Sequence, residues 1–232
     1  MKKILVLVAM VLLIAGTAFA DPFNTRPAAG TNLASLRSNL DTLYGPGIFD
    51  VNNQATAAIY QPSVVIGPTS SSFMLLLEIA GYDDENTFGI YSYSDPNKKL
   101  QVFAGPDSPF DSAAVSFQGG SVQLGNHPST KILNFGTAFG FYIATGGAET
   151  FYSEDSKNPG GLAQMLIYEF PGVANEYIIA IEDLNRVGSD SDFDDMLVKA
   201  SEVKPVPEPA TMLLLGSGLI GLAGYARRRF KK

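Results

Sequence analysis

The sequence predicts a mainly β protein whose body is an antiparallel β-sandwich of jelly-roll type, with one short helix near its N-terminus. Short segments rich in Val, Ile, Phe and Tyr follow one another from residue 57 to residue 200, and Gly, Pro, Asn and Asp separate them. Only one stretch of the body has helical periodicity. Many short strands of this kind favour two sheets packed face to face, and a flattened barrel is the alternative arrangement.

The predicted helix begins at Thr31 and Asn32, which are residue types that cap a first helical turn. Four leucines then recur at spacings of three and four residues, which places them on one face of a helix. These are Leu33, Leu36, Leu40 and Leu43. A Gly-Pro-Gly run at 45–47 ends the pattern.

Ten strands are expected after this helix. Two adjacent glycines, Gly119 and Gly120, separate two of them and predict a hairpin turn. The expected strands are 57–60, 73–79, 87–93, 100–104, 113–118, 121–124, 139–145, 164–170, 177–182 and 195–200.

The composition excludes several classes of site. The chain of 232 residues has no cysteine, which excludes disulfides, thiolate zinc sites, iron–sulfur clusters and cysteine nucleophiles, and its single histidine excludes poly-histidine metal sites. Residues 21–206 contain 22 acidic and nine basic residues, so this part has a net charge of −13. Such a charge repels a phosphate backbone, so we expect no nucleic-acid partner, and it attracts cations.

The first 20 residues have the plan of a secretory signal peptide. Two lysines precede an apolar run at 4–15, and Ala18 and Ala20 provide the small residues that a signal peptidase requires. We therefore expect cleavage before Asp21 and a mature protein on the outer side of the inner membrane.

The last 26 residues, 207–232, form a second targeting segment. Residues 210–226 carry no charge and have about the minimum length of a transmembrane helix. Five of the last six residues are basic and are expected to stay in the cytoplasm. The segment thus predicts a membrane anchor, with the 21–206 domain on the extracytoplasmic side.

The order of parts in this tail resembles the PEP-CTERM sorting signal. Its elements are the motif Pro207, Glu208 and Pro209, the apolar helix, and a basic cluster that includes Arg227, Arg228 and Arg229. The resemblance implies that an exosortase of a Gram-negative bacterium recognises the tail and removes it as the protein is sent to the cell surface or the exopolysaccharide matrix.

Three motifs of the body resemble secreted bacterial proteins that carry domain of unknown function 4114, often joined to a PEP-CTERM tail. They are 81–91, then 139–142 with 151–153, and finally 181–184 with 191–196. The resemblance covers most of residues 31–232. It implies an extracellular β domain and no established activity.

The densest acidic cluster of the chain predicts a calcium site. Six carboxylates fall within 14 residues, and Ca²⁺ takes six to eight oxygen ligands from flexible loops of this kind. The spacing starts like an EF-hand, but Asp195 stands at its sixth position and Ser201 at its twelfth, so an EF-hand is excluded. A solvated acidic turn is the alternative. The candidate ligands are Glu182, Asp183, Asp190, Asp192, Asp194 and Asp195.

A second acidic turn lies at Asp83, Asp84, Glu85 and Asn86. It completes the metal site if the strands bring the two turns together, and otherwise it is a plain hairpin loop.

Together these features predict an exported, non-enzymatic protein of the cell surface or exopolysaccharide matrix, stabilised by calcium and without catalytic residues. Its expected partners are the secretion machinery, the exosortase, the inner membrane during transit through residues 210–226, and exopolysaccharide. The alternative is a carbohydrate-binding module for exopolysaccharide. A secreted glycoside hydrolase that uses two of the carboxylates is the third reading.

Overall fold

The computed structural model describes residues 31–55, 57–64, 68–78, 85–125, 127–146, 149–185 and 188–206. The predicted signal peptide and sorting tail lie outside these residues. Thr25–Val206 forms one compact unit. None of the helices in the described ranges has the length and hydropathy needed to cross a bilayer.

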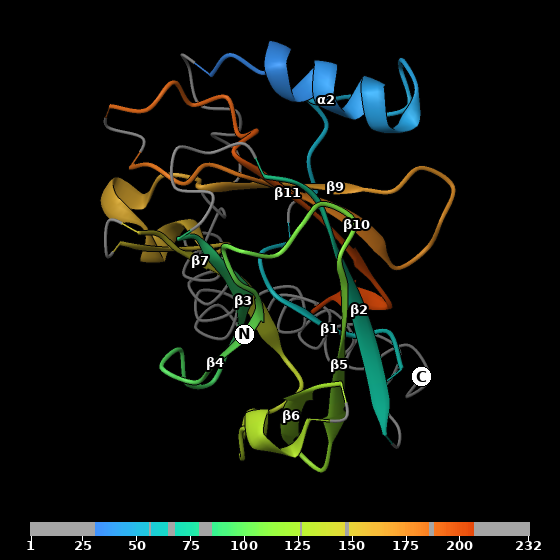
Figure 1. The fold of residues 1–232 in the computed structure, drawn as a ribbon, viewed down its shortest axis with the longest axis vertical. Helices are drawn as coiled ribbons and strands as arrows, with labels where there is room; N and C mark the ends of the chain where they lie inside the picture. Colours follow the sequence, from blue (N-terminus) through green and yellow to red (C-terminus); the bar gives the residue numbers. More distant parts are fainter. Residues whose placement is uncertain are drawn as a thin grey trace, which may run out of the picture. The chain divides into compact units, whose positions relative to one another are not determined.

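Two six-stranded sheets form the body, and all of their strand pairs are antiparallel. In sheet A the strand order is β12-β1-β7-β3-β4, with β8 paired to β7, and in sheet B it is β6-β5-β2-β11-β10-β9 (Figure 1). The strands of sheet A are β1 (Tyr60–Pro62), β3 (Thr87–Ser92), β4 (Lys99–Phe103), β7 (Phe139–Ala144), β8 (Thr150–Tyr152) and β12 (Val203–Pro205). Those of sheet B are β2 (Thr69–Glu78), β5 (Ser112–Gln118), β6 (Ser121–Leu124), β9 (Met165–Glu169), β10 (Glu176–Ile181) and β11 (Met196–Ser201).

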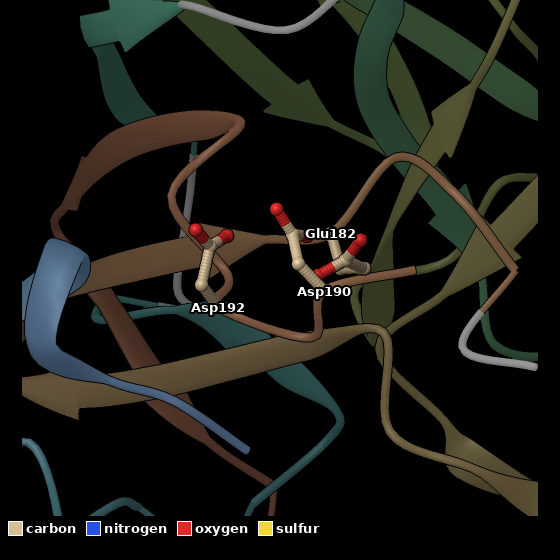
Figure 2. A group of neighbouring side chains, drawn as sticks. All are labelled: Glu182, Asp190 and Asp192. Atoms are coloured by element: carbon tan, nitrogen blue, oxygen red, sulfur yellow. The ribbon is translucent and has the colours of Figure 1, made fainter. Parts of the chain in front are cut away.

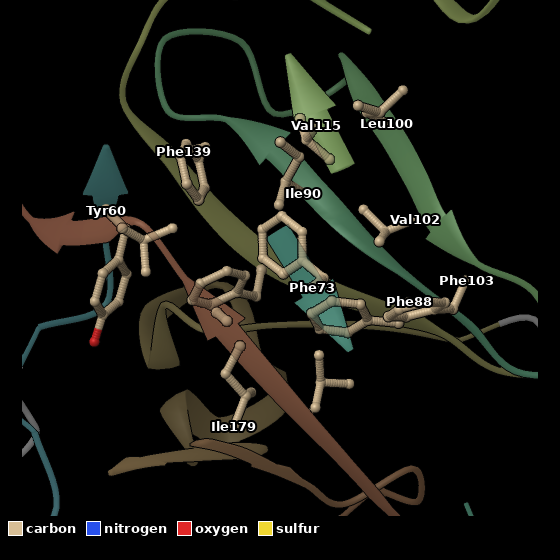
Figure 3. Packing of buried hydrophobic residues seen from close by; sticks show 14 of the residues in the cluster. Tyr60, Phe73, Phe88, Ile90, Leu100, Val102, Phe103, Val115, Phe139 and Ile179 are labelled. Atoms are coloured by element: carbon tan, nitrogen blue, oxygen red, sulfur yellow. The ribbon is translucent and has the colours of Figure 1, made fainter. Parts of the chain in front are cut away.

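The main hydrophobic core lies between the two sheets and is dominated by phenylalanine. Phe141 of β7 is fully buried, and its ring contacts Phe73 of sheet B with centroids 6.3 Å apart and Phe88 of sheet A at 6.1 Å. Figure 3 shows this packing around Phe73 and Phe88. In β9 and β10, residues of the main core alternate with residues that face the other side of sheet B, as a sandwich requires.

A second core covers the outer face of sheet B. Helix α2 (Ala34–Tyr44) places Leu36 and Leu40 against Ile178 and Ala180, the residues of β10 that face away from the main core. Figure 1 shows α2 on this side of β9 and β11. The protein thus has three layers, and the third layer matters for the site because the loop between β10 and β11 contacts α2.

The predicted antiparallel sandwich with one short α-helix is confirmed, and so is the leucine face of the helix. The predicted hairpin joins β5 to β6, and Gly119 and Gly120 adopt φ values of 56° and 76° there. Three strands were missed or displaced, namely β1, β8 and β12. Each has only three residues, and β1 and β12 contain proline, which removes the usual strand signal. The described ranges also contain three short 3-10 turns: η2 (Pro128–Thr130), η3 (Asp155–Lys157) and η4 (Pro159–Gly161).

Residues 21–206 are expected to fold without the sorting tail, because the two cores and the two sheets of the described residues are built from residues before Pro207. Circular dichroism and a cooperative thermal transition of this fragment test the expectation. A fragment without a cooperative transition would mean that the tail contributes to the fold.

Candidate metal centre

All six predicted ligands lie in the connection between β10 and β11. This loop starts after Ile181 and ends before Met196, two residues that are paired across the strands. Glu182 and Asp195 therefore stand side by side at the base of the loop, and the remaining carboxylates follow from the loop between them. Antiparallel pairing thus brings together residues that are more than ten positions apart in the sequence.

Three of these carboxylates converge on one point. Glu182, Asp190 and Asp192 each provide an oxygen, and these oxygens all lie within 4.8 Å of one another. Figure 2 shows the three side chains facing each other across the loop. Ca²⁺ binds oxygens at 2.3–2.6 Å, so two ligands of one ion are at most about 5 Å apart. The spacing of the three oxygens therefore fits a single ion.

Glu182 is the most unusual of the three residues, because its side chain is fully buried. Its Oε1 atom has no hydrogen-bond partner, whereas its Oε2 atom accepts a long bond, 3.4 Å, from the backbone N–H of Phe193, and the side chain of Ser189 also hydrogen-bonds to the carboxylate. Burial raises the pKa of Glu182 to about 7. An unpaired buried oxygen of this kind destabilises a fold by ~1–3 kcal/mol, and more when the group is charged. A cation at this point removes that penalty.

The three side chains differ in their exposure to solvent. Asp190 is exposed, Asp192 is half-buried and Glu182 is buried. An ion held between them is therefore reached from solvent on the side of Asp190.

A second group of three shares Asp192 with the first. Asp192, Asp194 and Asp195 also present oxygens within 4.8 Å of one another. Burial, followed by the neighbouring carboxylates, raises the pKa of Asp192 to about 6 and that of Asp195 to about 8. Asp183 and Glu182 contribute to the shift of Asp195, so the negative charges repel one another across the whole base of the loop.

Two of the predicted ligands bind neighbouring elements. The Oδ2 atom of Asp194 accepts hydrogen bonds from Asn39, at 2.9 Å, and from the hydroxyl of Ser35, both on helix α2. The Oδ2 atom of Asp183 accepts a bond of 3.0 Å from the amide of Asn86. These carboxylates thus have partners of their own, and Asp183 belongs to neither converging group.

The contact between Asn86 and Asp183 brings the second acidic turn against the cluster. Asn86 is fully buried, and its Oδ1 atom has no hydrogen-bond partner. Glu85 is exposed, and Asp83 and Asp84 lie outside the described residues. The two turns therefore meet through one residue pair of the described chain.

Basic side chains do not neutralise the loop in the described part of the chain. The ion pairs there join Lys98 to Asp95, Lys157 to Glu154 and Lys199 to Glu176. None of them includes a carboxylate of the loop. Arg186 lies outside the described residues.

Sequence reasoning missed Phe193, which fixes the loop. It is fully buried in the core beneath α2 and adopts a φ of 60°, in the left-handed region that a phenylalanine rarely occupies. Its neighbours Asp192 and Asp194 are therefore held on either side of an anchored residue. The sequence does contain a signal for this role, namely a large apolar residue between two acidic ones. In a solvated turn such a residue would be exposed to water.

Comparison with known proteins identifies the tail. A family model described as the PEP-CTERM protein-sorting motif matches residues 205–229, which confirms the predicted sorting motif. No curated protein matches this chain. The resemblance to domain of unknown function 4114 stays a prediction.

One solved structure found by the comparison is the lectin CV2L of Chromobacterium violaceum in complex with α-methyl-fucoside. It has 11% sequence identity and a TM-score of 0.33, over 66% of this chain and 100% of the lectin chain. A likeness this low carries no inference. The match to the sorting motif does carry one: the chain bears a PEP-CTERM signal and is therefore an exported protein processed by an exosortase, with a membrane-anchored precursor.

Proposed function

We propose that this chain is a non-enzymatic protein of the bacterial cell surface or exopolysaccharide matrix, and that its β domain is stabilised by Ca²⁺ at the β10–β11 loop. Glu182, Asp190 and Asp192 are the main ligands in this proposal. Asp195 belongs to the second converging group, which shares Asp192 with the first, while Asp183 and Asp194 hold the loop to its neighbours.

The observation that supports the metal site best is the Oε1 atom of Glu182. It is buried, it has no hydrogen-bond partner, and two further carboxylate oxygens lie within 4.8 Å of the glutamate's contributing oxygen. A merely solvated acidic turn gives no reason to bury a glutamate, because water would satisfy that group at the surface.

Calcium fits the chemistry of these ligands. All are carboxylates, which are hard oxygen donors, and the chain has no cysteine that would favour a softer metal. Ca²⁺ also tolerates irregular geometry and completes its coordination with water, which the exposed side of the site admits.

Calcium is expected to raise the melting temperature of residues 21–206 by a few degrees. Extracellular Ca²⁺ modules bind with dissociation constants on the order of 10⁻⁴–10⁻³ M. At ~1 mM ion and the tighter end of that range, binding contributes ~1.4 kcal/mol to stability. For a domain of this size that corresponds to a shift of a few degrees. The measurement is a melting curve in EDTA, in Ca²⁺ and in Mg²⁺ at equal ionic strength.

The variants Asp192→Asn and Glu149→Gln make this test specific. Asp192 belongs to both converging groups, so its replacement should abolish the shift, while its stability in EDTA should be no lower than that of the wild type because repulsion is relieved. Glu149 is exposed and lies outside the loop, so Glu149→Gln removes the same charge and should keep the shift. Equal melting temperatures of the wild type in all three solutions would contradict the proposal.

The two other functions remain predictions. Binding to a glycan array would favour a carbohydrate-binding module. Hydrolysis of a glycan that is lost on substitution of a single carboxylate would favour the hydrolase.

A further inference from the structure

The sorting motif begins inside the folded domain. The family match starts at residue 205, and strand β12 spans Val203–Pro205. Pro205 is paired with Tyr60 of β1, and the next residue, Val206, donates its backbone N–H to the carbonyl of Ile59 at 3.0 Å. The chain is thus hydrogen-bonded to sheet A up to the residue before Pro207. Only residues 207–209 separate this point from the apolar run.

Residues of both sheets contact strand β12 and the residue just before it. Val203 is fully buried and belongs to the core between the sheets. Just before it, Glu202 adopts a φ of 59° as the chain crosses from β11 in sheet B to β12 in sheet A. The carbonyl of Glu202 accepts bonds from the N–H of Ser63 at 2.9 Å and from the hydroxyl of Ser71 at 3.1 Å. The hydroxyl of Ser63 also donates to the Glu202 carboxylate at 2.5 Å.

The outer edge of β12 offers no backbone N–H donor to a further strand. The bonds at Val206 and Glu202 fix the register, so the N–H positions of residues 203 and 205 face away from β1. The N–H of Val203 donates to the carbonyl of Asn175 at 3.2 Å, and Pro205 has no N–H. An enzyme therefore finds no free backbone donor on β12 with which to add its own strand to this edge.

We propose that exosortase processing requires β12 to detach from β1, so that the stability of this edge sets the rate at which the tail is removed. A processing enzyme needs several residues of its substrate in an extended and accessible form, and folded proteins supply these by local opening. The residues just before Pro207 belong to β12 or are hydrogen-bonded next to it, so in the folded domain they are not accessible to the enzyme. Detachment of one short edge strand exposes them while the remaining strands stay paired.

The first test lengthens the chain between strand β12 and Pro207, where the Pro-Glu-Pro part of the motif begins. A Gly-Ser-Gly-Ser insertion between Val206 and Pro207 leaves β12 unchanged and gives the enzyme a free segment. In a bacterium that carries an exosortase, pulse-chase labelling should show precursor processing accelerated at least about fivefold, because the enzyme no longer waits for β12 to open and even a single hydrogen bond of ~1 kcal/mol corresponds to that factor. The same insertion between Gly119 and Gly120, in the exposed β5–β6 turn, is the control and should leave the rate unchanged.

The second test weakens the strand without moving the motif. Ser63→Ala removes the hydroxyl that binds Glu202 and should raise both the processing rate and the hydrogen-exchange rate of the Lys204 and Val206 amides. An insertion variant that is processed at the wild-type rate or more slowly would overturn the proposal. Failure of every protein, the wild type included, to lose its tail in that host would overturn the exosortase assignment itself, and this inference with it.

Discussion

Replacing Phe141 with alanine is expected to lower the free energy of unfolding by ~3–5 kcal/mol. The side chain is fully buried at the centre of the sandwich. Its ring lies 5.3 Å from that of Tyr60, 5.9 Å from that of Phe139, 6.1 Å from that of Phe88 and 6.3 Å from that of Phe73. Alanine leaves a cavity bordered by both sheets, and rigid strands on either side limit how far the cavity can close.

Urea denaturation of residues 21–206 measures this loss as a decrease in the midpoint at an unchanged slope. Phe110→Ala is the matched control, because Phe110 is 63% exposed in the turn between β4 and β5. Its replacement should change stability by less than ~0.5 kcal/mol. If the two variants lost equal stability, Phe141 would not occupy the centre of the core.

The ion-free domain is expected to become less stable as the pH rises from 5 to 8. Glu182, Asp192 and Asp195 have folded-state pKa values raised to about 7, 6 and 8, whereas unfolded Asp and Glu titrate near pH 4. Between these limits the folded state binds more protons than the unfolded state, so stability falls with increasing pH. The three carboxylates interact with one another, so the loss of stability belongs to the group as a whole and is not the sum of three separate contributions.

Urea midpoints in EDTA at several pH values between 5 and 8 test this sign. Asp195→Asn should flatten the profile, because it removes the carboxylate with the largest shift while its amide oxygen can still accept the bond from the Asp183 N–H. Saturating Ca²⁺ should also flatten the profile, because it stabilises the ionised carboxylates. Stability that rises with pH in EDTA would mean that the carboxylates are already neutralised in the absence of an ion.

The sequence was sufficient to predict the sandwich, its helix and its central strands, but it missed or displaced the short strands β1, β8 and β12 of sheet A. The leucine spacing of α2 and the Val- and Phe-rich runs report directly on which faces are buried, so helix and central strands could be predicted. Strands β1 and β12 could not, because three residues with a proline show no alternation. Their pairing depends on a contact between residues that are more than 140 positions apart, such as Tyr60 and Pro205.

For the candidate metal site, the sequence was enough to locate the loop, but it could not show which of the six acidic residues has which role. Six clustered acids predict a cation, but spacing alone does not tell which oxygens converge. The structure separates Glu182, which has one buried oxygen without a hydrogen-bond partner, from Asp194, which binds Ser35 and Asn39 of the distant helix α2. The different roles of these residues depend on tertiary contacts and on the buried residue Phe193. A search for metal ligands does not consider Phe193, because its side chain has no ligand atom.

A crystal structure of residues 21–206 grown with Ca²⁺ tests the central claim most directly. The account predicts an ion within 2.3–2.6 Å of oxygens of Glu182, Asp190 and Asp192, with an anomalous signal that is absent from crystals grown in EDTA. It also predicts that the Oε1 atom of Glu182 gains the ion as its partner. A Ca²⁺-soaked crystal with only water between these carboxylates, or with Glu182 turned away from them, would contradict it.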